Sequence, residues 1–194
     1  MPTEDIEALD RDDMARLKAG QDAAISSLME RHAAAVFRFL YRMLGDEEDA
    51  RDLAQETFAR VYRSRESFRP EHAFGNWLLT IAGNLARNRM RWRIRHPTVP
   101  LEPADESANS SLHDVLPADT PPPDCELQAE ERNAAVRHAV WQLPEDLREA
   151  IVLCEWQDLA VAEAARIIGT TPKAVESRLY RARRLLREQL DQWL

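Results

Sequence analysis

The chain has 194 residues and a formal net charge of −8, a length that allows one large or two small domains. Its two cysteines, Cys125 and Cys154, are too few and too isolated for a disulfide framework or a zinc site, and no apolar run approaches the ~20 residues of a membrane span. Since the chain also lacks a glycine-rich phosphate loop and a nucleophile motif, we expect a cytoplasmic protein with no enzymatic activity, metal or cofactor.

A first long helix is predicted over about residues 22–44, because apolar side chains recur there at helical spacing. They are Ile25, Leu28, Met29, Val36, Phe37, Leu40 and Leu44, with His32 among them. We expect His32 to be a packed or half-exposed helix residue and not a metal ligand. Gly45 should end this helix, and Asp46 can cap the next one.

The second helix begins with three carboxylates, which the helix dipole stabilises at that end. Its buried stripe is predicted to contain Ala50, Leu53, Ala54, Thr57, Phe58 and Val61. Asp52, Gln55 and Glu56 should point outward, and packing does not explain why these residue types occur there. After a loop-like stretch over 67–72, a third helix begins near Phe74.

The third helix has a core face of Trp77, Leu78, Ile81 and Leu85, followed by a cationic end. Arginines occupy every second position of that end, at Arg87, Arg89, Arg91, Arg93 and Arg95, with Asn88, Met90 and Trp92 between them. Arginines near an aromatic side chain suit backbone contact and base stacking on single-stranded nucleic acid. A solvated helix end favoured by the helix dipole explains the arginines equally well.

The whole net charge of −8 comes from residues 96–130, which hold eight carboxylates and no Lys or Arg. This proline-rich segment shows little apolar periodicity, so it cannot bury enough surface to offset its ordering entropy. We expect a linker there, attracted at low salt to the cationic helices on either side.

The last fifty residues predict a helix-turn-helix. Ala164, Ala165 and Ile168 mark a short first helix, which Gly169 can stop in the left-handed conformation. Thr171 can cap the second helix, and Pro172 suits its first position. The second helix has an apolar face of Val175, Leu179, Ala182 and Leu186, opposite a polar face of Lys173, Ser177, Tyr180, Arg181 and Arg184. Such a face fits the major groove of duplex DNA, although a basic run can also simply solvate a helix. Glu176 would repel phosphate.

Taken together, these motifs resemble a known family. Residues 45–58 and 74–86 are similar to the core domain of bacterial sigma factors, and residues 143–184 are similar to their promoter-upstream domain. With only these two domains, the chain resembles the extracytoplasmic-function class. The resemblance implies an all-α fold with two small helical domains: a sigma core bundle over 1–95 and a helix-turn-helix domain over 127–194, joined by the acidic proline-rich linker 96–126.

The resemblance also implies a function, which is transcription initiation with core RNA polymerase on promoter DNA. Asp52, Gln55 and Glu56 would dock on a coiled coil of the largest polymerase subunit. The −10 element would be contacted by Phe68, Asn84, Arg87, Asn88 and Arg91. The −35 element would be contacted by Lys173, Ser177, Arg178, Tyr180, Arg181 and Arg184. An anti-sigma factor is implied as a further partner. Residues 159–163 lack the aromatic side chain often found there, and Glu176 replaces a common basic residue, so the −35 sequence preference stays open.

Two other classes of protein remain as alternatives. A helix-turn-helix regulator acting without polymerase would need dimerisation and a ligand or receiver domain. A helical metalloenzyme could use the carboxylates Asp46, Glu47, Asp49 and Asp52, although no Glu-x-x-His motif on another helix accompanies them.

Overall fold

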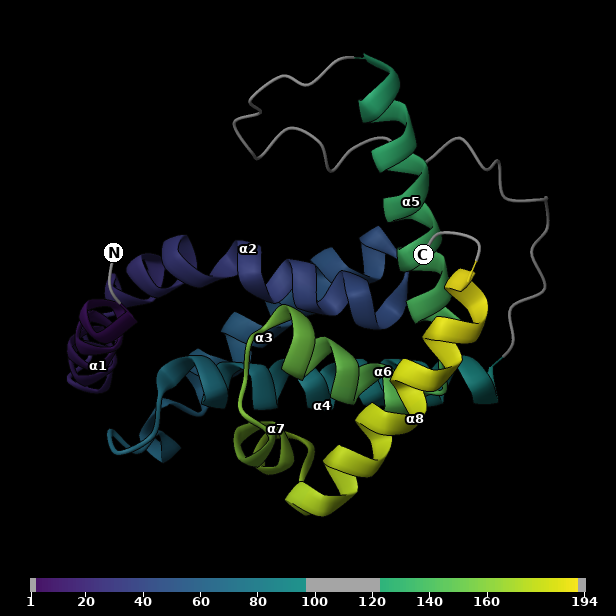
Figure 1. Cartoon of the computed structure of the whole chain (residues 1–194). Coiled ribbons are helices and arrows are strands. Elements are labelled where there is room, and N and C mark those ends of the chain that lie inside the picture. Colours follow the sequence, from purple (N-terminus) through teal and green to yellow (C-terminus); the bar gives the residue numbers. More distant parts are fainter. Residues whose placement is uncertain (1–2, 97–122, 192–194) are drawn as a thin grey trace.

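The computed structural model describes residues 3–96 and 123–191, with side chains for 5–96 and 130–191, and this part of the chain is helical without strands (Figure 1). The helices are α1 (Thr3–Lys18), α2 (Ala24–Leu44), α3 (Glu47–Arg63), α4 (Phe74–Arg95), α5 (Pro123–Trp141), α6 (Glu145–Ile151), α7 (Val161–Ile168) and α8 (Pro172–Leu190), with a 3-10 turn η1 (Arg65–Ser67) and a π-helical segment η3 (Val152–Trp156). The all-α fold expected from the sequence is confirmed. None of the helices in these ranges is long and apolar enough to cross a membrane.

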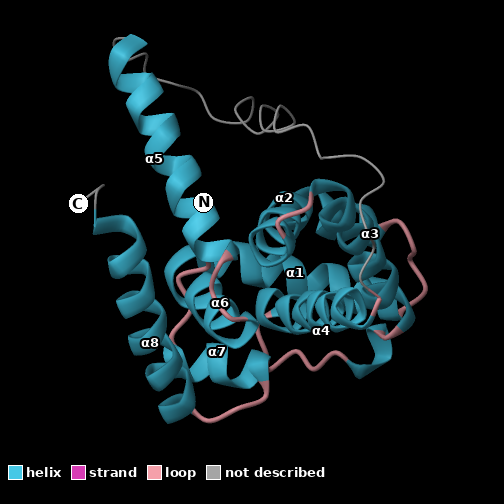
Figure 2. Cartoon of the chain, turned by 90° about the vertical axis from the view of Figure 1, so that its right-hand side faces the viewer, coloured by secondary structure: helices cyan, strands magenta, loops and turns pink. Residues whose placement is uncertain are grey.

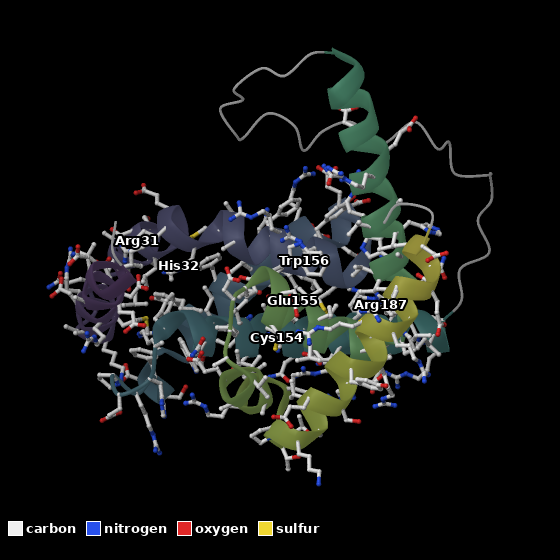
Figure 3. All side chains as sticks on the ribbon, viewed as in Figure 1. Arg31, His32, Cys154, Glu155, Trp156 and Arg187 are labelled. Atoms are coloured by element: carbon white, nitrogen blue, oxygen red, sulfur yellow. The ribbon has the colours of Figure 1, made fainter. Side chains whose placement is uncertain are left out.

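The first unit, α1 to α4, is a bundle in which α2 packs against the other three helices. Figure 1 shows α1 lying across the end of α2 where α2 begins. A network of charged side chains ties the two together, because Arg31 donates to Asp10 at 2.9 Å and to Asp13 at 2.6 Å, and His32 lies 2.8 Å from Asp10 (Figure 3). His32 is therefore a packed helix residue, as predicted.

The predicted cap between α2 and α3 is present. Gly45 ends α2 at φ 70°, in the left-handed region, and the Asp46 side chain accepts a hydrogen bond from the Asp49 amide at 2.9 Å. A Cβ added at Gly45 would lie 3.2 Å from the ring of Trp141, on α5. The ring of Trp141, from the second half of the chain, therefore packs against this tight turn.

The second unit, α5 to α8, contains the predicted helix-turn-helix. Gly169 stops α7 at φ 77°, and the Thr171 side chain accepts a hydrogen bond from the Ala174 amide at 3.2 Å. Between α6 and α7 the chain passes through η3, and Asp158 adopts a positive φ of 50°. Figure 2 shows α8 on the outer side of this unit, with α6 and α7 between it and α4.

The two units share one hydrophobic core, although the sequence suggested separate domains. Helix α4 packs against α7, and α2 packs against both α5 and α6. The half-buried Arg148 of α6 strengthens the junction by donating to the Met43 carbonyl of α2 at 2.5 Å. It also donates to the Trp141 carbonyl of its own unit at 2.6 Å. The helix of the second unit already begins at Pro123, inside the segment 96–126 expected to be linker. The rest of that segment, and with it its expected attraction to the helices, lies outside the described residues.

The turn at Gly45 yields a test of the contact between the units. Gly45→Ala is expected to lower the free energy of unfolding by about 2 kcal/mol, since a Cβ in the left-handed region costs roughly 1–2 kcal/mol and the new methyl group also displaces Trp141. Gly20→Ala is the matched control, because Gly20 has φ 84° with nothing within 4 Å of the added Cβ. Urea unfolding measures both. Equal losses for the two variants would show that Trp141 does not pack on Gly45.

Candidate nucleic-acid interface

The outer face of α4 carries most of the residues expected at the −10 element. Asn84, Asn88 and Arg91 are exposed on it, and Arg87 is half-buried. Arg87 donates to the Asn84 side-chain oxygen at 2.7 Å. The exposed ring of Trp92 stacks on His96 with ring centroids 4.8 Å apart. This arrangement of amides, a cation and an exposed aromatic ring suits melted DNA, because unpaired bases need both hydrogen-bond partners and stacking surfaces.

Phe68 is the exception among these residues. Its side chain is 3% exposed and lies in an aromatic cluster with Phe74 and Trp77, at centroid distances of 6.0 and 5.2 Å. In this structure the ring cannot touch a base, which corrects its expected place in the site. The buried position of Phe68 is favourable because it removes the apolar surface of the ring from water. Phe68 anchors the loop 67–72 instead.

The arginines at the end of α4 divide into two kinds. Arg89 pairs with Asp49, and Arg93 pairs with Asp49 at 2.5 Å and with Asp46 at 3.0 Å. These contacts attach α4 to the start of α3, and they engage two carboxylates of the acidic cluster considered as a metal site. Among described residues, Arg91 has no side-chain partner, so it is available for a ligand.

The second helix of the helix-turn-helix, α8, separates its two faces as predicted. Val175, Leu179 and Ala182 are at most 5% exposed. The opposite side has a cationic strip of exposed side chains, which consists of Lys173, Ser177, Tyr180, Arg181 and Arg184. Tyr180 is 70% exposed on this strip, so its ring and hydroxyl are open to a ligand. Glu176 is exposed on the same helix.

The two surfaces meet in a charged junction that the sequence did not indicate. Arg87 of α4 pairs with Glu149 of α6, whose side chain is 3% exposed. Arg178 of α8 lies 3.5 Å from Asp146, and Arg181 lies 3.9 Å from the same carboxylate. A cleft of about 390 Å³ between the units is lined by both arginines, Arg87 and Arg178, together with the carboxylates of α6. Both predicted DNA-reading surfaces thus lose part of their positive charge to α6.

Burial controls the electrostatics of this junction. Desolvation raises the pKa of the Glu149 carboxyl, and the nearby Arg87 and Arg178 oppose that shift. Burial likewise lowers the pKa of the Arg148 guanidinium. A Cβ at Gly83 would lie 3.2 Å from Glu149 Oε1, so the missing side chain lets α6 approach α4 closely. Sequence reasoning missed Glu149 because its partner is 62 residues away, and no local pattern marks such a pair.

The outward face of α3 carries the three residues expected to dock on polymerase. Asp52 and Gln55 are exposed, and the Glu56 side chain is 37% exposed. Glu56 accepts from Arg60 at 2.9 Å and from Arg63 at 2.7 Å. Hydrogen bonding from Arg60 is the main reason that the pKa of Glu56 is lowered. The carboxylate therefore stays charged, while the side chains of Asp52 and Gln55 make no hydrogen bond or ion pair with a described residue.

Comparison with known proteins identifies the family. The model of sigma-70 region 2 matches residues 28–95, and the model of sigma-70 region 4 matches residues 133–186. Together they span the α2–α4 bundle and the helix-turn-helix unit. These are the two units that meet at the charged junction.

Relatives that match over most of the chain show which class of sigma factor it belongs to. The ECF RNA polymerase sigma-E factor of Haemophilus influenzae is 33% identical, over 91% of this chain and 92% of its own. The RNA polymerase sigma-H factor of Pseudomonas aeruginosa is 31% identical, over 91% of both chains. The ECF RNA polymerase sigma factor SigE of Mycolicibacterium smegmatis is 35% identical, and the chain spans 64% of its length. The protein therefore belongs to the extracytoplasmic-function class of sigma-70 family sigma factors.

Two solved structures are similar in fold. The first, CnrH in complex with the cytosolic domain of CnrY, aligns at a TM-score of 0.68 and 27% identity over 95% of this chain and 98% of that chain. The second, the sigma factor RpoE in complex with the anti-sigma factor NepR from Bartonella quintana, aligns at 0.65 and 25% identity over 87% of this chain and 98% of that chain. Both are structures of a complex of two proteins, and the second is a sigma factor with an anti-sigma factor.

Proposed function

We propose that the protein is an alternative sigma factor that binds core RNA polymerase in the cytoplasm and directs it to promoters with −10 and −35 elements. The observation that carries this proposal is the presence of region 2 and region 4 in one chain, at the positions of the two helical units. The protein would act by binding alone, without covalent chemistry. It would help melt the −10 region by holding unstacked bases, each of which costs a few kcal/mol to extract.

Polymerase docking is assigned to the outward face of α3. Asp52, Gln55 and Glu56 lie on a helix whose opposite face is buried against α2 and α4. Their polar character has no packing role, so a partner surface accounts for it best. The expected partner is the coiled coil of the largest polymerase subunit.

Promoter reading is divided between α4 and α8. Asn84, Asn88, Arg87 and Arg91 would contact the melted −10 element, with the loop anchored by Phe68 beside them. The cationic strip of α8, with Arg178 at its edge, would enter the major groove at the −35 element. Because Arg87 of the first unit pairs with Glu149 of the second, the two units have to separate before the whole −10 surface can contact DNA. The contact of Arg178 with Asp146 lies within the second unit and does not depend on that separation. Polymerase binding would supply that separation.

An anti-sigma factor is the third proposed partner. One of the similar solved structures is a sigma factor bound to an anti-sigma factor. An inhibitor of this kind would act on the present chain by preventing the units from separating. Which protein fills this role is to be found by copurification.

Transcription by purified components tests the function directly. Core RNA polymerase supplemented with this protein should start transcripts at a restricted set of promoters, which sequencing of the transcripts would reveal. A helix-turn-helix regulator would instead form a stable dimer that binds palindromic DNA without polymerase. Size-exclusion chromatography with such DNA distinguishes the two, and a dimer without promoter-specific transcripts would refute the sigma assignment.

The docking surface can be tested by a double substitution. Gln55→Ala with Glu56→Ala should leave the fold intact and weaken binding to core polymerase by about tenfold or more, since loss of one hydrogen bond to a charged group costs about 1.5–3 kcal/mol. Pull-down with core enzyme measures the effect. The matched control is Glu188→Ala with Gln189→Ala, which removes the same two residue types from exposed positions of α8. Unchanged pull-down for the first variant would show that α3 is not the docking surface.

The −10 contact can be tested at Asn84. Asn84→Ala should abolish or strongly reduce open-complex formation while polymerase binding stays the same, because only an unpaired base would meet this exposed amide. Permanganate footprinting on a cognate promoter detects the unpaired thymines. Equal reactivity for the variant and the parent protein would return Asn84 to the role of a surface amide that orients Arg87.

A further inference from the structure

A second pocket, which shares no lining residue with the charged junction, lies between α2, α5 and η3. Its volume is about 240 Å³. Three arginines line it, Arg38, Arg42 and Arg137, together with three aromatic rings, Tyr41, Trp141 and Trp156. Figure 3 marks Trp156 near the middle of the molecule. Neither the docking surface nor the two DNA-reading surfaces use any of these six side chains.

The aromatic rings form the walls of this pocket. Tyr41 meets Trp141 edge to face at a centroid distance of 5.4 Å, and Phe37 stacks on Tyr41 from the outside at 6.2 Å. The Arg42 guanidinium lies over the Trp156 ring at 5.6 Å. A flat group inserted here would find π-faces and a guanidinium plane to stack on, which is how proteins bind bases without reading their sequence.

The positive charge of the pocket is not neutralised by the described residues around it. None of the lining side chains is a carboxylate, and Arg38, Arg42 and Arg137 form no ion pair or hydrogen bond with a described residue. Three acidic groups on elements next to the pocket are engaged elsewhere, because Asp46 pairs with Arg93, Glu47 with Arg51, and Glu155 with Arg183. Burial, together with the neighbouring Arg38, lowers the pKa of Arg42. Three neighbouring guanidinium groups repel one another, so their arrangement around one pocket favours an anionic ligand.

We propose that this pocket binds a nucleoside diphosphate, with the base between the aromatic walls and the phosphates on the three guanidiniums. Guanidinium groups bind phosphate through paired hydrogen bonds, which favours a phosphate over a carboxylate ligand. The volume is below the ~300 Å³ of a site that encloses a drug-sized molecule. It accommodates a base, while the phosphates remain at the open rim beside the exposed Arg38.

The pocket also connects the two units, since α2 belongs to the first and α5 and η3 belong to the second. A ligand that contacts both Arg42 and Arg137 would oppose the separation of the two units. Binding should therefore raise the unfolding temperature of the free protein, because a ligand that binds only the folded state stabilises it.

Isothermal titration of the full-length protein with ADP or GDP, without divalent cations, tests the proposal. We expect saturable binding, with adenosine and pyrophosphate each binding at least about tenfold more weakly because each lacks one half of the ligand. Arg42→Gln should weaken ADP binding about tenfold to hundredfold, as expected for losing a charged hydrogen-bond partner. Trp156→Leu should reduce the affinity for ADP toward that for pyrophosphate. Arg11→Gln, an exposed arginine of α1, is the charge-matched control and should bind ADP as the parent does.

Several outcomes would overturn the proposal. They are the absence of saturable binding at millimolar ADP and GDP, equal affinity for pyrophosphate and ADP, or an equal loss for Arg11→Gln and Arg42→Gln. If circular dichroism shows that Arg42→Gln does not fold, Arg38→Gln, at an exposed position, is used in its place and should also weaken ADP binding. The titration uses no polymerase, so its result is independent of the proposed role in transcription.

Discussion

Arg87→Ala is expected to lower the free energy of unfolding by about 3 kcal/mol at neutral to alkaline pH, because it leaves the buried Glu149 carboxylate without its partner. Glu149 is 3% exposed, so its carboxylate would lose its direct partner in a largely desolvated place. Arg91→Ala is the matched control on the same helix, and should change stability by less than about 0.5 kcal/mol. Urea unfolding measures both.

The pH dependence of the same variant provides a second readout. Desolvation raises the folded-state pKa of Glu149 above its unfolded value. The stability that this group contributes is therefore fully present below the unfolded pKa, about 4.3, and is lost as pH rises through the folded pKa. Removing Arg87 removes an opposing influence on this pKa, so the total loss should be larger and extend to higher pH in Arg87→Ala than in the parent.

Neutralising the acid should rescue the variant. Glu149→Gln in the Arg87→Ala background keeps the shape of the side chain but removes its charge, so most of the lost stability should return at alkaline pH. If Arg87→Ala costs less than about 1 kcal/mol at every pH, the two residues do not form a buried pair and the junction is held by apolar packing alone.

The second large effect is expected on α8. Arg181→Ala with Arg184→Ala should weaken binding of the polymerase complex to −35 duplex by about tenfold to hundredfold, since a good base contact is worth about 1–3 kcal/mol. The log–log salt dependence should become shallower by up to about 1.8, because each lost phosphate contact removes about 0.9 from the slope. Affinity measured against salt concentration gives both quantities.

The control for this experiment lies on the same helix. Arg183→Ala with Arg187→Ala makes an identical change in charge on another side of α8, where Arg183 pairs with Glu155. Affinity and slope should then stay near those of the parent complex. If the two double variants lose affinity equally, α8 contributes only general positive charge, and its cationic strip does not enter the groove.

Helix ends and turns were predictable because their causes are local. Gly45 and Gly169 adopt the left-handed conformation, and Asp46 and Thr171 cap the helices that follow them. Each effect depends on neighbours within four residues, so the sequence carries it in full. The apolar face of α8 was correct for the same reason, since helical spacing is a property of the chain alone. That of α2 was correct only in part, because Met29 is 38% exposed while Phe39 and Met43, which were not predicted, are buried.

Side-chain environments at the site were harder to predict. Phe68 was expected to meet a base and is buried, and Arg89 and Arg93 are bound to the start of α3 while Arg91 is free of described partners. Helical spacing places arginines on different sides of α4 but does not say which side faces a carboxylate. That depends on how α4 packs against α3, a contact between residues about 40 positions apart.

The amino-acid sequence by itself determined the helices, the helix-turn-helix and the membership of the sigma family, because these depend on periodicity, caps and motifs within short segments. Only the tertiary structure decided that the two units share a core. It placed Arg87 on Glu149 and Arg178 near Asp146, and it brought Arg42, Arg137 and Trp156 to one pocket. Such contacts join residues far apart in the chain, and their energy depends on burial, which no local pattern records.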